Sequence, residues 1–385
     1  MRFCYEGRDH TEGSKMSLED LRRKIDETDT QIVRLVAERV RIAAEIGREK
    51  GKQGIEVVDW AREKAVLEKV KDIAREESIS QGDVERIYKQ IVTVCREVQQ
   101  QVKVAFQGEI GAYSEEAAFN FFGPSVQIQP YESFDDVFKA VENREVGFGI
   151  VPVENSLEGS ISRVYDLLLD SPLRVCGEME LRVVHCLIAN PRARLDSIKK
   201  VYSHPQALAQ CRAFLKHLGC ELIPSYDTAG SVRMIREKGM ADGAAIASAR
   251  AAEIYGMKIL AQGIEDNPNN FTRFFVLSKQ DSPPSGCDKT SIVFSVKEEP
   301  GTLYKALRKF AMRNINLTKL ESRPTRQKPW EYNFYLDCEG HRQGKMLEEA
   351  LKNLERTSLF VKVLGSYPKA KPPSPDPSLG RRGVS

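Results

Sequence analysis

An uninterrupted helical pattern close to the N-terminus constrains this chain more than any other feature. Apolar residues recur there at steps of three and four, on one face of a helix: Leu18, Leu21, Ile25, Ile32, Leu35, Ile42 and Ile46. A helix of roughly 33 residues is about 50 Å long, which is too long to be covered within a small monomeric domain. We therefore expect it to pack against partner helices from a second copy of the chain.

Two shorter helices are predicted after it, near residues 57–76 and over about 81–101. The third helix carries its own apolar stripe, made of Val84, Ile87, Ile91, Val94 and Val98. Together these segments predict an all-α domain over residues 16–101. Residues 1–15 are expected to form a disordered extension.

The pattern changes at Val102, where short apolar strands begin to alternate with helical stretches. Strands are predicted over 102–106, 146–151, 181–189, 200–203, 244–247 and 273–278. This alternation predicts an α/β domain with largely parallel sheets over residues 102–280. The segment 281–286, Asp-Ser-Pro-Pro-Ser-Gly, is predicted to be a linker.

The region after this linker has a different order of elements. Strands are predicted over 290–296, 315–322, 332–338 and 360–365, and helices from about Pro300 and Gly344. The order β-α-β-β-α-β is that of an α+β ferredoxin-like domain, here over 289–367. The tail 368–385 is rich in proline and serine, and we expect it to be disordered.

Composition restricts the classes of function. A chain of 385 residues exceeds one ordinary domain, and its net charge of +3 gives no reason to expect a nucleic-acid partner. No apolar run is long enough for a membrane span, and the N-terminus has no signal-peptide core. The eight cysteines form no C-x-x-C pair and the histidines are scattered. We therefore expect a cytoplasmic protein with no metal and no cofactor.

Charged and polar residues lie on faces of the predicted helices that should be buried: Arg39, Lys50, Asp59, Arg62, Glu63, Cys95 and Gln99. Burying unpaired charge costs several kcal/mol per ion, so these groups need partners. Internal salt bridges would satisfy them. A polar pocket for a small polyanion would satisfy them too, and the spacing leaves both readings open.

The motifs of this region resemble the all-helical chorismate mutase family. They are Leu-Arg-Arg-Lys-Ile-Asp at 21–26, Ala-Glu-Arg at 37–39, Gly-x-x-Lys at 47–50 and Asp-x-x-Arg-Glu at 59–63. The resemblance implies that Arg22, Arg39 and Lys50 bind the substrate carboxylates, with Arg22 supplied by the partner of a homodimer. It implies that Lys50 and Gln99 reach the ether oxygen, that Asp59 and Glu63 hold the ring hydroxyl, and that Arg62 supports them. Cys95 stands where some relatives have a hydroxyl residue.

Four polar loops follow or enter predicted strands of the α/β region, at 108–114, 151–156, 202–206 and 269–275. Taken alone, a loop of this kind is more often a turn or a helix cap than a site. The first could hold an anion on backbone N–H groups, but it is not the G-x-G-x-x-G of a dinucleotide site. Loops of this kind usually line one cleft in an α/β fold.

Together, four stretches of the region resemble the prephenate dehydratase family: 147–155, 164–168, 202–206 and Asn-Phe-Thr-Arg-Phe at 270–274. The resemblance implies two α/β lobes, built like a type-2 periplasmic binding protein, that close on prephenate. Thr272 is expected to be catalytic as a hydrogen-bond donor, and Glu154 to be the proton source. The expected prephenate-binding residues are Asn155, Ser203, His204, Thr228 and Arg273. His204 could equally be a structural residue at a helix start.

The C-terminal region resembles the ACT regulatory domain, through Leu-Glu-Ser-Arg-Pro at 320–324 and Pro-Gly-Thr-Leu-Tyr at 300–304. This implies an effector site for phenylalanine with Glu321, Ser322, Arg323, Gly301 and Leu303. A purely structural dimerisation domain is the other reading. Overall, the chain is expected to convert chorismate to prephenate and prephenate to phenylpyruvate, under inhibition by phenylalanine. The alternatives are a small-molecule sensor and a mutase with a degenerate dehydratase half.

Overall fold

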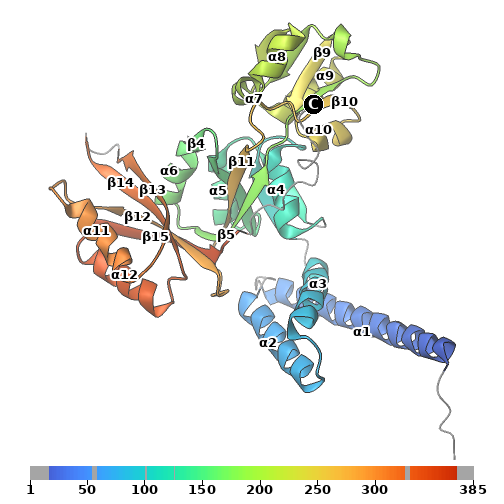
Figure 1. Ribbon diagram of the computed structural model, residues 1–385, viewed down its shortest axis with the longest axis vertical. Helices are drawn as coiled ribbons and strands as arrows, with labels where there is room; N and C mark the ends of the chain where they lie inside the picture. Colours follow the sequence, from blue (N-terminus) through green and yellow to red (C-terminus); the bar gives the residue numbers. More distant parts are fainter. Residues whose placement is uncertain (1–16, 54–58, 100–101, 125, 326–329, 371–385) are drawn as a thin grey trace, which may run out of the picture. The chain divides into compact units, whose positions relative to one another are not determined.

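A computed structural model describes residues 17–53, 59–99, 102–124, 126–325 and 330–370 (Figure 1). The chain forms two compact units, residues 1–100 and 101–385. The expected extension 1–15 and most of the expected tail, 371–385, lie outside the described residues. Among the residues that are described, no helix is both long and apolar enough to cross a membrane.

The first unit is all-α, as predicted. It consists of α1 (Leu18–Gln53), α2 (Trp60–Glu76) and α3 (Gln81–Gln99), and both α1 and α2 pack against α3. The α1 helix starts at a reciprocal cap. The Ser17 hydroxyl accepts from the Asp20 N–H at 3.1 Å, and the Asp20 carboxylate accepts from the Ser17 N–H at 3.2 Å.

The apolar stripe of α1 remains uncovered in the single chain. Its large side chains keep 44–65% of their surface exposed: Leu18, Leu21, Ile25, Ile32, Leu35, Ile42 and Ile46. Figure 1 shows α1 extending well past the part of it that contacts α3. A contiguous apolar surface of this kind marks an interaction site.

The second unit begins with a six-stranded sheet in the order β2-β1-β3-β11-β5, with β4 beside β3. Its strands are β1 (Lys103–Gln107), β2 (Gln127–Tyr131), β3 (Phe148–Asn155), β4 (Gly159–Ser160), β5 (Arg174–Arg182) and β11 (Phe271–Ser278). The helices of this first lobe are α4 (Tyr113–Phe122), α5 (Phe134–Glu142) and α6 (Ser162–Asp170).

A second lobe is built on a five-stranded sheet in the order β10-β6-β9-β7-β8. Its strands are β6 (Cys186–Ala189), β7 (Lys200–Ser203), β8 (Glu221–Pro224), β9 (Gly243–Ala247) and β10 (Lys258–Gln262). Its helices are η1 (Leu195–Ser197), α7 (Pro205–Gln210), α8 (Arg212–Leu218), α9 (Thr228–Glu237) and α10 (Ala249–Ile254). The two-lobed α/β prediction is confirmed.

Two details of the sequence prediction are wrong. The sheets are mixed, not largely parallel, because β11 returns from the second lobe and enters the first sheet antiparallel to both β3 and β5. In the second sheet β6 is antiparallel to β9 and β10. The strand predicted over 181–189 is the end of β5 and the start of β6, because the chain crosses between lobes there.

The C-terminal domain has the predicted ferredoxin-like order. Its sheet β13-β14-β12-β15 is antiparallel throughout. It consists of β12 (Asp288–Ser295), α11 (Thr302–Ala311), β13 (Leu317–Pro324), β14 (Tyr332–Glu339), α12 (Lys345–Glu355) and β15 (Phe360–Pro368). Both helices pack on one face of the sheet, over a core that includes Ile292, Phe310 and Leu354.

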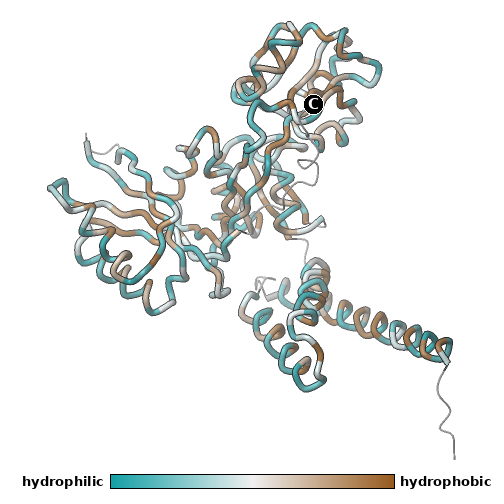
Figure 2. The backbone as a smooth tube through the Cα atoms, viewed as in Figure 1, coloured by the Kyte–Doolittle hydropathy of each residue, from teal (hydrophilic) through white to brown (hydrophobic). Residues whose placement is uncertain are grey.

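The other face of this sheet is buried against the first lobe. Val293, Tyr335, Leu364 and Tyr367 belong to the same apolar core as side chains of β3, β5 and β11. Gly365 allows the close approach, since a Cβ there would overlap the Val175 carbonyl. Figure 2 shows the apolar segments gathered in the strands of these sheets.

The predicted linker is also packed. Ser282 is buried and donates to the Cys176 carbonyl at 2.5 Å, and Asp281 pairs with Arg342. Three residues of the expected disordered tail are placed as well, since Pro368 ends β15 and Lys369 and Ala370 follow it. The Lys369 N–H donates to the Cys287 carbonyl at 2.9 Å, and the Ala370 N–H donates to Glu178 at 2.9 Å. The first lobe and the C-terminal domain therefore form one body.

Candidate functional sites

Polar contacts in the helical unit join its three helices. Arg39 on α1 is half-buried and donates from Nη1 to the sulfur of Cys95 on α3 at 2.7 Å. Glu63 on α2 is held by the guanidinium of Arg96, with Nε–Oε1 at 2.9 Å and Nη2–Oε2 at 2.5 Å. Arg96 also stacks over the Trp60 ring at 4.9 Å. For Glu63, therefore, the internal salt bridge is present, with a partner that the sequence analysis did not identify.

The other predicted mutase residues are spread along the helices. The Asp59 carboxylate caps α2 by accepting from the Arg62 N–H at 2.9 Å, while Lys50 is half-buried near the end of α1. Gln99 ends α3, but its side chain lies outside the described residues. Arg22 is exposed and lies 17 positions before Arg39, about 25 Å along α1 at 1.5 Å per residue. The single chain therefore does not bring Arg22 to the group around Arg39.

A pocket of about 140 Å³ lies between the two α/β lobes. It is lined by Tyr113, Asn155, Val183, His185, His204, Gln206, Ala207, Gln210, Asp227, Thr228 and Thr272. Asn155 and Thr272 end β3 and begin β11, where these strands are paired. The second lobe contributes the starts of α7 and α9. Four of the predicted residues, Asn155, His204, Thr228 and Thr272, are thus brought together.

The orientation of the Asn155 amide is fixed by the backbone. Its Oδ1 accepts from the N–H groups of Leu157 and Glu158, at 3.0 and 3.2 Å. Its Nδ2 must therefore be the atom that faces the Thr272 hydroxyl oxygen, at 3.1 Å. Because that oxygen accepts this bond, the Thr272 proton is left to donate elsewhere.

A chain of hydrogen bonds leads from Asn155 across the pocket. Asn155 Nδ2 donates to Asn270 Oδ1 at 2.8 Å, and Asn270 Nδ2 donates to Gln210 Oε1 at 2.8 Å. Gln210 Oε1 then lies 2.9 Å from His185 Nε2, and His185 Nδ1 lies 3.0 Å from the Tyr113 hydroxyl. Since Gln210 offers an oxygen, His185 Nε2 must carry the proton.

Burial sets the protonation of this chain. Desolvation lowers the pKa of His185 below its ordinary value, although Gln210 and Glu265 oppose the shift. His185 is then neutral near pH 7, and its Nδ1 is an acceptor that the Tyr113 hydroxyl faces. Burial also raises the pKa of Tyr113 well above 10, so that this hydroxyl keeps its proton.

His204 and Ser203 have structural partners. His204 caps α7, since its Nδ1 accepts from the Gln206 N–H at 3.3 Å, in line with the structural reading of this histidine. Ser203 is fully buried and donates to the Ile246 carbonyl at 2.7 Å. Ser203 does not line the pocket, so the prediction that it contacts prephenate is not supported by its placement.

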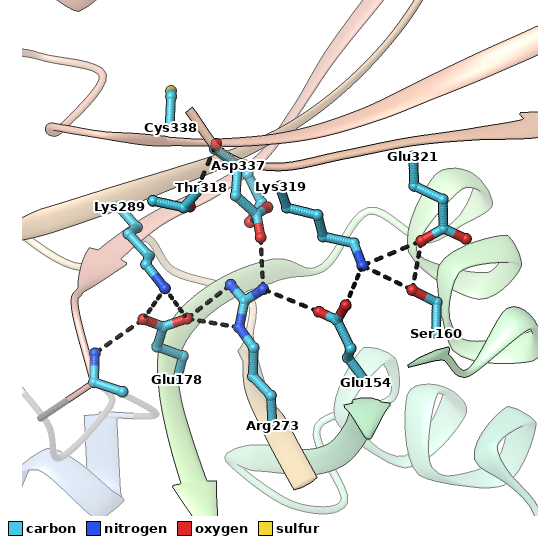
Figure 3. Close-up of polar contacts among 12 residues, drawn as sticks. Glu154, Ser160, Glu178, Arg273, Lys289, Thr318, Lys319, Glu321, Asp337 and Cys338 are labelled. Atoms are coloured by element: carbon cyan, nitrogen blue, oxygen red, sulfur yellow. Dashed lines mark hydrogen bonds and ion pairs between the residues drawn. The ribbon is translucent and has the colours of Figure 1, made fainter. Parts of the chain in front are cut away.

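Glu154 and Arg273, predicted as the proton source and a prephenate-binding residue, contact the C-terminal domain. Adjacent residues of a strand point to opposite faces, so when Asn155 and Thr272 face the pocket, Glu154 and Arg273 face away from it. Figure 3 shows both side chains directed toward the C-terminal domain. Glu154 lies 2.9 Å from Lys319, and Arg273 lies 2.6 Å from Asp337. Neither side chain lines the pocket in this structure.

Several residues of the pocket and of its hydrogen-bond chain were not singled out as site residues by the sequence. Tyr113, His185, Gln206, Gln210 and Asp227 line the pocket, and Asn270 belongs to the chain behind it. Asn270 stands inside the quoted 270–274 motif, and Tyr113 inside the first loop, so their motifs were the available signal. Asp227 caps α9 by accepting from the Gly230 N–H at 2.7 Å, and burial raises its pKa. His185 and Gln210 meet only in the folded chain.

The first loop contacts the second lobe. Glu115 accepts from the Gly111 N–H at 2.9 Å and pairs with Arg250 at 2.7 Å, while Ser248 donates to the Gly111 carbonyl at 2.7 Å. Gly111 has φ +93°, and a Cβ there would lie 2.9 Å from the Ala251 Cα. This loop therefore serves as a contact between the lobes.

A larger groove of about 810 Å³ lies in the C-terminal domain. Leu303 lines it, with Pro300, Thr302, Trp330 and Phe360 among its other residues. The adjoining Gly301 has φ +80°, a backbone conformation that favours glycine.

The other predicted effector residues do not line this groove. Glu321 pairs with Lys319 at 3.1 Å, and Arg323 pairs with Asp166 of the first lobe at 2.9 Å. Ser322 is exposed. Glu321 and Arg323 therefore lie at the interface between the C-terminal domain and the first lobe.

Comparison with known proteins agrees with the order of the domains. Residues 21–100 match the chorismate mutase type II family, residues 104–282 match prephenate dehydratase, and residues 290–356 match the ACT domain. The bifunctional chorismate mutase/prephenate dehydratase of Aquifex aeolicus is 41% identical over 92% of this chain and 98% of its own length.

Two further similarities each cover about 70% of the chain. Arogenate dehydratase/prephenate dehydratase 2 of Arabidopsis thaliana is 46% identical over 69% of this chain and 73% of its own length. The solved prephenate dehydratase of Arthrobacter aurescens in complex with L-Phe is 31% identical, with a TM-score of 0.65 over 70% of this chain and 90% of that one. Because it contains the chorismate mutase, prephenate dehydratase and ACT domains in that order and matches the Aquifex protein over nearly its whole length, the chain belongs to the bifunctional chorismate mutase/prephenate dehydratase family.

Proposed function

We propose that the two reactions occur at two separate sites, the first around Arg39 in the helical unit and the second around Thr272 between the α/β lobes. The observation that carries the second assignment is the bond from Asn155 Nδ2 to the Thr272 oxygen at 3.1 Å. It leaves the threonine proton available to the substrate. The assignments in the helical unit rest on the family motifs together with the contacts of Arg39 and Glu63.

The mutase step needs no nucleophile or base, because the rearrangement of chorismate is pericyclic. Its catalyst must select a compact conformation and stabilise negative charge that gathers on the ether oxygen. Arg39 and Lys50 are the cations for the carboxylates, and Lys50 and Gln99 are the donors to the ether oxygen. Asp59 and Glu63 hold the ring hydroxyl, supported by Arg62.

The active mutase is a homodimer in which Arg22 completes the site of the partner subunit. The uncovered stripe of α1 supports this, since seven large apolar side chains remain exposed along it. The distance of about 25 Å between Arg22 and Arg39 along α1 also supports it. Antiparallel pairing of two α1 helices would bring one Arg22 toward the other chain's Arg39.

The dehydratase step expels carbon dioxide and hydroxide from prephenate. The electrons of the breaking C–C bond enter the ring, and the C–O bond breaks with its electrons on the departing oxygen. Thr272 donates a hydrogen bond to that oxygen, and Asn155 orients Thr272. His204 and Thr228, at the starts of two helices, bind the rest of the substrate. Asp227 supplies the carboxyl group among the lining residues, and burial raises its pKa. It is therefore better placed than Glu154 to be the proton source.

Phenylalanine binds the ACT domain of this chain and inhibits the dehydratase. The L-Phe complex of the Arthrobacter relative supports this. So does the groove that Leu303 lines, in which Trp330 and Phe360 supply apolar surface beside the polar residues Thr302 and Asn333. We place the protein in the cytoplasm, because the described cysteines are all free thiols and most are buried.

Replacement of Thr272 by valine and by serine tests the central assignment. Valine keeps the shape and removes the hydroxyl, while serine keeps the hydroxyl. With added prephenate, Thr272→Val should lower kcat about 10²–10³-fold, as loss of one oriented donor does, and Thr272→Ser should retain most of the rate. Equal loss in both variants would reject donation by this hydroxyl. A parallel assay with arogenate shows whether the second unit shares the substrate named for its plant relative.

A further inference from the structure

Two pairs of neighbouring residues connect the pocket to the ACT domain. On β11, Thr272 faces the pocket and Arg273 faces the ACT sheet. On β3, Asn155 faces the pocket and Glu154 faces the ACT sheet. The strand register places Thr272 opposite Asn155 and Arg273 opposite Glu154. The register with β3 shifts directly after Arg273, a local irregularity of the kind found beside active sites.

The Arg273 guanidinium spans the boundary between the domains. Its Nε and Nη2 lie 2.8 and 2.7 Å from Glu178 on β5, and its Nη1 lies 2.6 Å from Asp337 on β14. Nη2 also donates to the Tyr367 hydroxyl at 3.1 Å. The side chains of Arg273, Glu178 and Asp337 are 11%, 0% and 4% exposed. Figure 3 shows this cluster between the two domains.

A second link runs parallel to the first. Glu154 lies 2.9 Å from the Lys319 ammonium on β13, and Lys319 also contacts Glu321 at 3.1 Å and the Ser160 hydroxyl at 2.7 Å. Both strands that carry pocket residues are therefore tied to the ACT sheet by charged groups.

These contacts are rigid for physical reasons. A buried guanidinium that binds two carboxylates through a planar fork fixes distance and direction, which an ammonium cannot do. Burial opposes the charge of Arg273, but Tyr367, Asp337 and Glu178 raise its pKa above the ordinary value. Glu178 also pairs with Lys289 at 2.9 Å, and Arg273 Nη1 also lies 3.8 Å from Glu154, so more than one carboxylate holds the guanidinium in place.

We propose that Arg273 is a positioning residue for the dehydration step, which fixes β11 against the ACT sheet and so places the Thr272 hydroxyl. When β14 moves, Asp337 moves with it. Because Arg273 is bound to Asp337, the backbone of β11 next to Thr272 shifts as well. A shift of about 1 Å in a catalytic group can cost roughly 10²-fold in rate. The inference rests on the role proposed for Thr272, and it assigns the charged contact through which the ACT domain acts on that residue.

Asp337→Asn tests this from the ACT side, because it removes one charge from a residue that does not line the pocket. The matched control is Glu339→Gln on the same strand, whose carboxylate pairs with Lys369 at 2.6 Å and is 38% exposed. Asp337→Asn should lower kcat on prephenate about tenfold or more while KM changes less than threefold. Glu339→Gln should behave as wild type.

Arg273→Lys tests the same link from the first lobe. Lysine keeps the charge but cannot bind Glu178 and Asp337 through one planar fork. The expected result is a fall in kcat with KM for prephenate nearly unchanged. A residue that bound the substrate carboxylate would instead show its main effect in KM. A KM effect alone would therefore overturn the proposal and restore the substrate-binding assignment.

The response to phenylalanine supplies a readout that simple loss of packing would not change. Calorimetry should show that Asp337→Asn still binds phenylalanine, while the inhibition of kcat by saturating phenylalanine falls at least fivefold.

If Asp337→Asn does not fold, Lys319→Gln addresses the parallel link with the same two measurements and a smaller expected effect. Wild-type kcat and inhibition in the folded variant would overturn the proposal. If Thr272→Val is inactive while Asp337→Asn is normal, this inference alone fails.

Discussion

The amide nitrogen of Asn155 lies 3.1 Å from the hydroxyl oxygen of Thr272, and two backbone N–H groups hold the amide in that orientation. The direction of one hydrogen bond therefore decides where the threonine proton points. An acceptor in place of this donor would draw the proton away from the substrate.

Asn155→Asp makes that exchange with almost no change in volume. An ionised aspartate can only accept hydrogen bonds, so it should accept one from the Thr272 hydroxyl, which then no longer donates to the substrate. Its negative charge should also repel the substrate carboxylates. We expect dehydratase kcat to fall about 10²-fold or more at pH 7.5 and to recover partly as pH falls toward the aspartate pKa. Asn143→Asp, at the exposed end of α5, is the control for a new charge. A flat pH profile with wild-type kcat would contradict the assignment.

His185 should make the stability of the α/β unit depend on pH. Burial lowers its folded-state pKa below 6.5, with Gln210 and Glu265 acting in the opposite direction. Above pH 6.5 the residue is neutral in both states, so its full contribution to stability is present. Below that value the unfolded chain binds a proton that the folded chain does not, so stability falls as pH falls toward the folded pKa.

The measurement is Tm between pH 7.5 and 5.5 for the wild type, His185→Gln and His217→Gln. His217 is exposed on α8 and serves as the matched histidine control. His185→Gln should lose less Tm on acidification than the wild type, and His217→Gln should follow the wild type. Identical slopes for all three proteins would show that His185 is not the group that titrates.

Removal of the ACT domain should destabilise the dehydratase. Val293, Tyr335, Leu364 and Tyr367 share a core with the first lobe, and each large buried apolar side chain contributes about 1.5–3 kcal/mol. A chain that ends at residue 288 should therefore show a lower Tm and expose apolar surface to a hydrophobic dye. Truncation of residues 1–100, a separate compact unit, is the comparison. An unchanged dehydratase Tm after ACT removal would contradict the shared core.

Leu35→Glu on α1 tests the dimeric mutase. In a lone chain this side chain is 65% exposed, so the substitution should change stability by no more than about 0.5 kcal/mol. In a dimer it places a charge in the helix–helix interface. We expect mutase activity to fall at least tenfold while dehydratase activity persists. Arg34→Glu introduces the same residue one position away, and a similar loss there would argue against a specific apolar contact.

The sequence predicted the helices and strands better than it predicted which side of a strand faces the pocket. The long helix α1 followed from its apolar spacing, and the ferredoxin-like domain followed from the order of its strands. Thr272 and Asn155 were identified through motifs, and both line the pocket. The same motifs also suggested Glu154 and Arg273, because a motif shows which residues are neighbours but not which side of a strand faces the substrate.

Tertiary contacts account for the other differences. His185 and Gln210 are 25 residues apart and join only where the two lobes meet. The mixed sheet direction depends on where the chain returns from the second lobe, which no local pattern encodes. The linker 281–286 has the composition of a loose segment but is fixed by Ser282 and Asp281 against other domains.

The most direct test of two separate sites is a mixing experiment with Arg39→Ala and Thr272→Val, each supplied with chorismate and assayed for phenylpyruvate. Arg39→Ala should fail to consume chorismate yet convert added prephenate, and Thr272→Val should accumulate prephenate. Neither variant alone should form phenylpyruvate at more than about 1% of the wild-type rate, since each lacks one oriented group. An equimolar mixture should restore its formation from chorismate. If both variants are folded and the mixture stays inactive, or if either substitution disables both steps, the two reactions do not occur at the separate sites described.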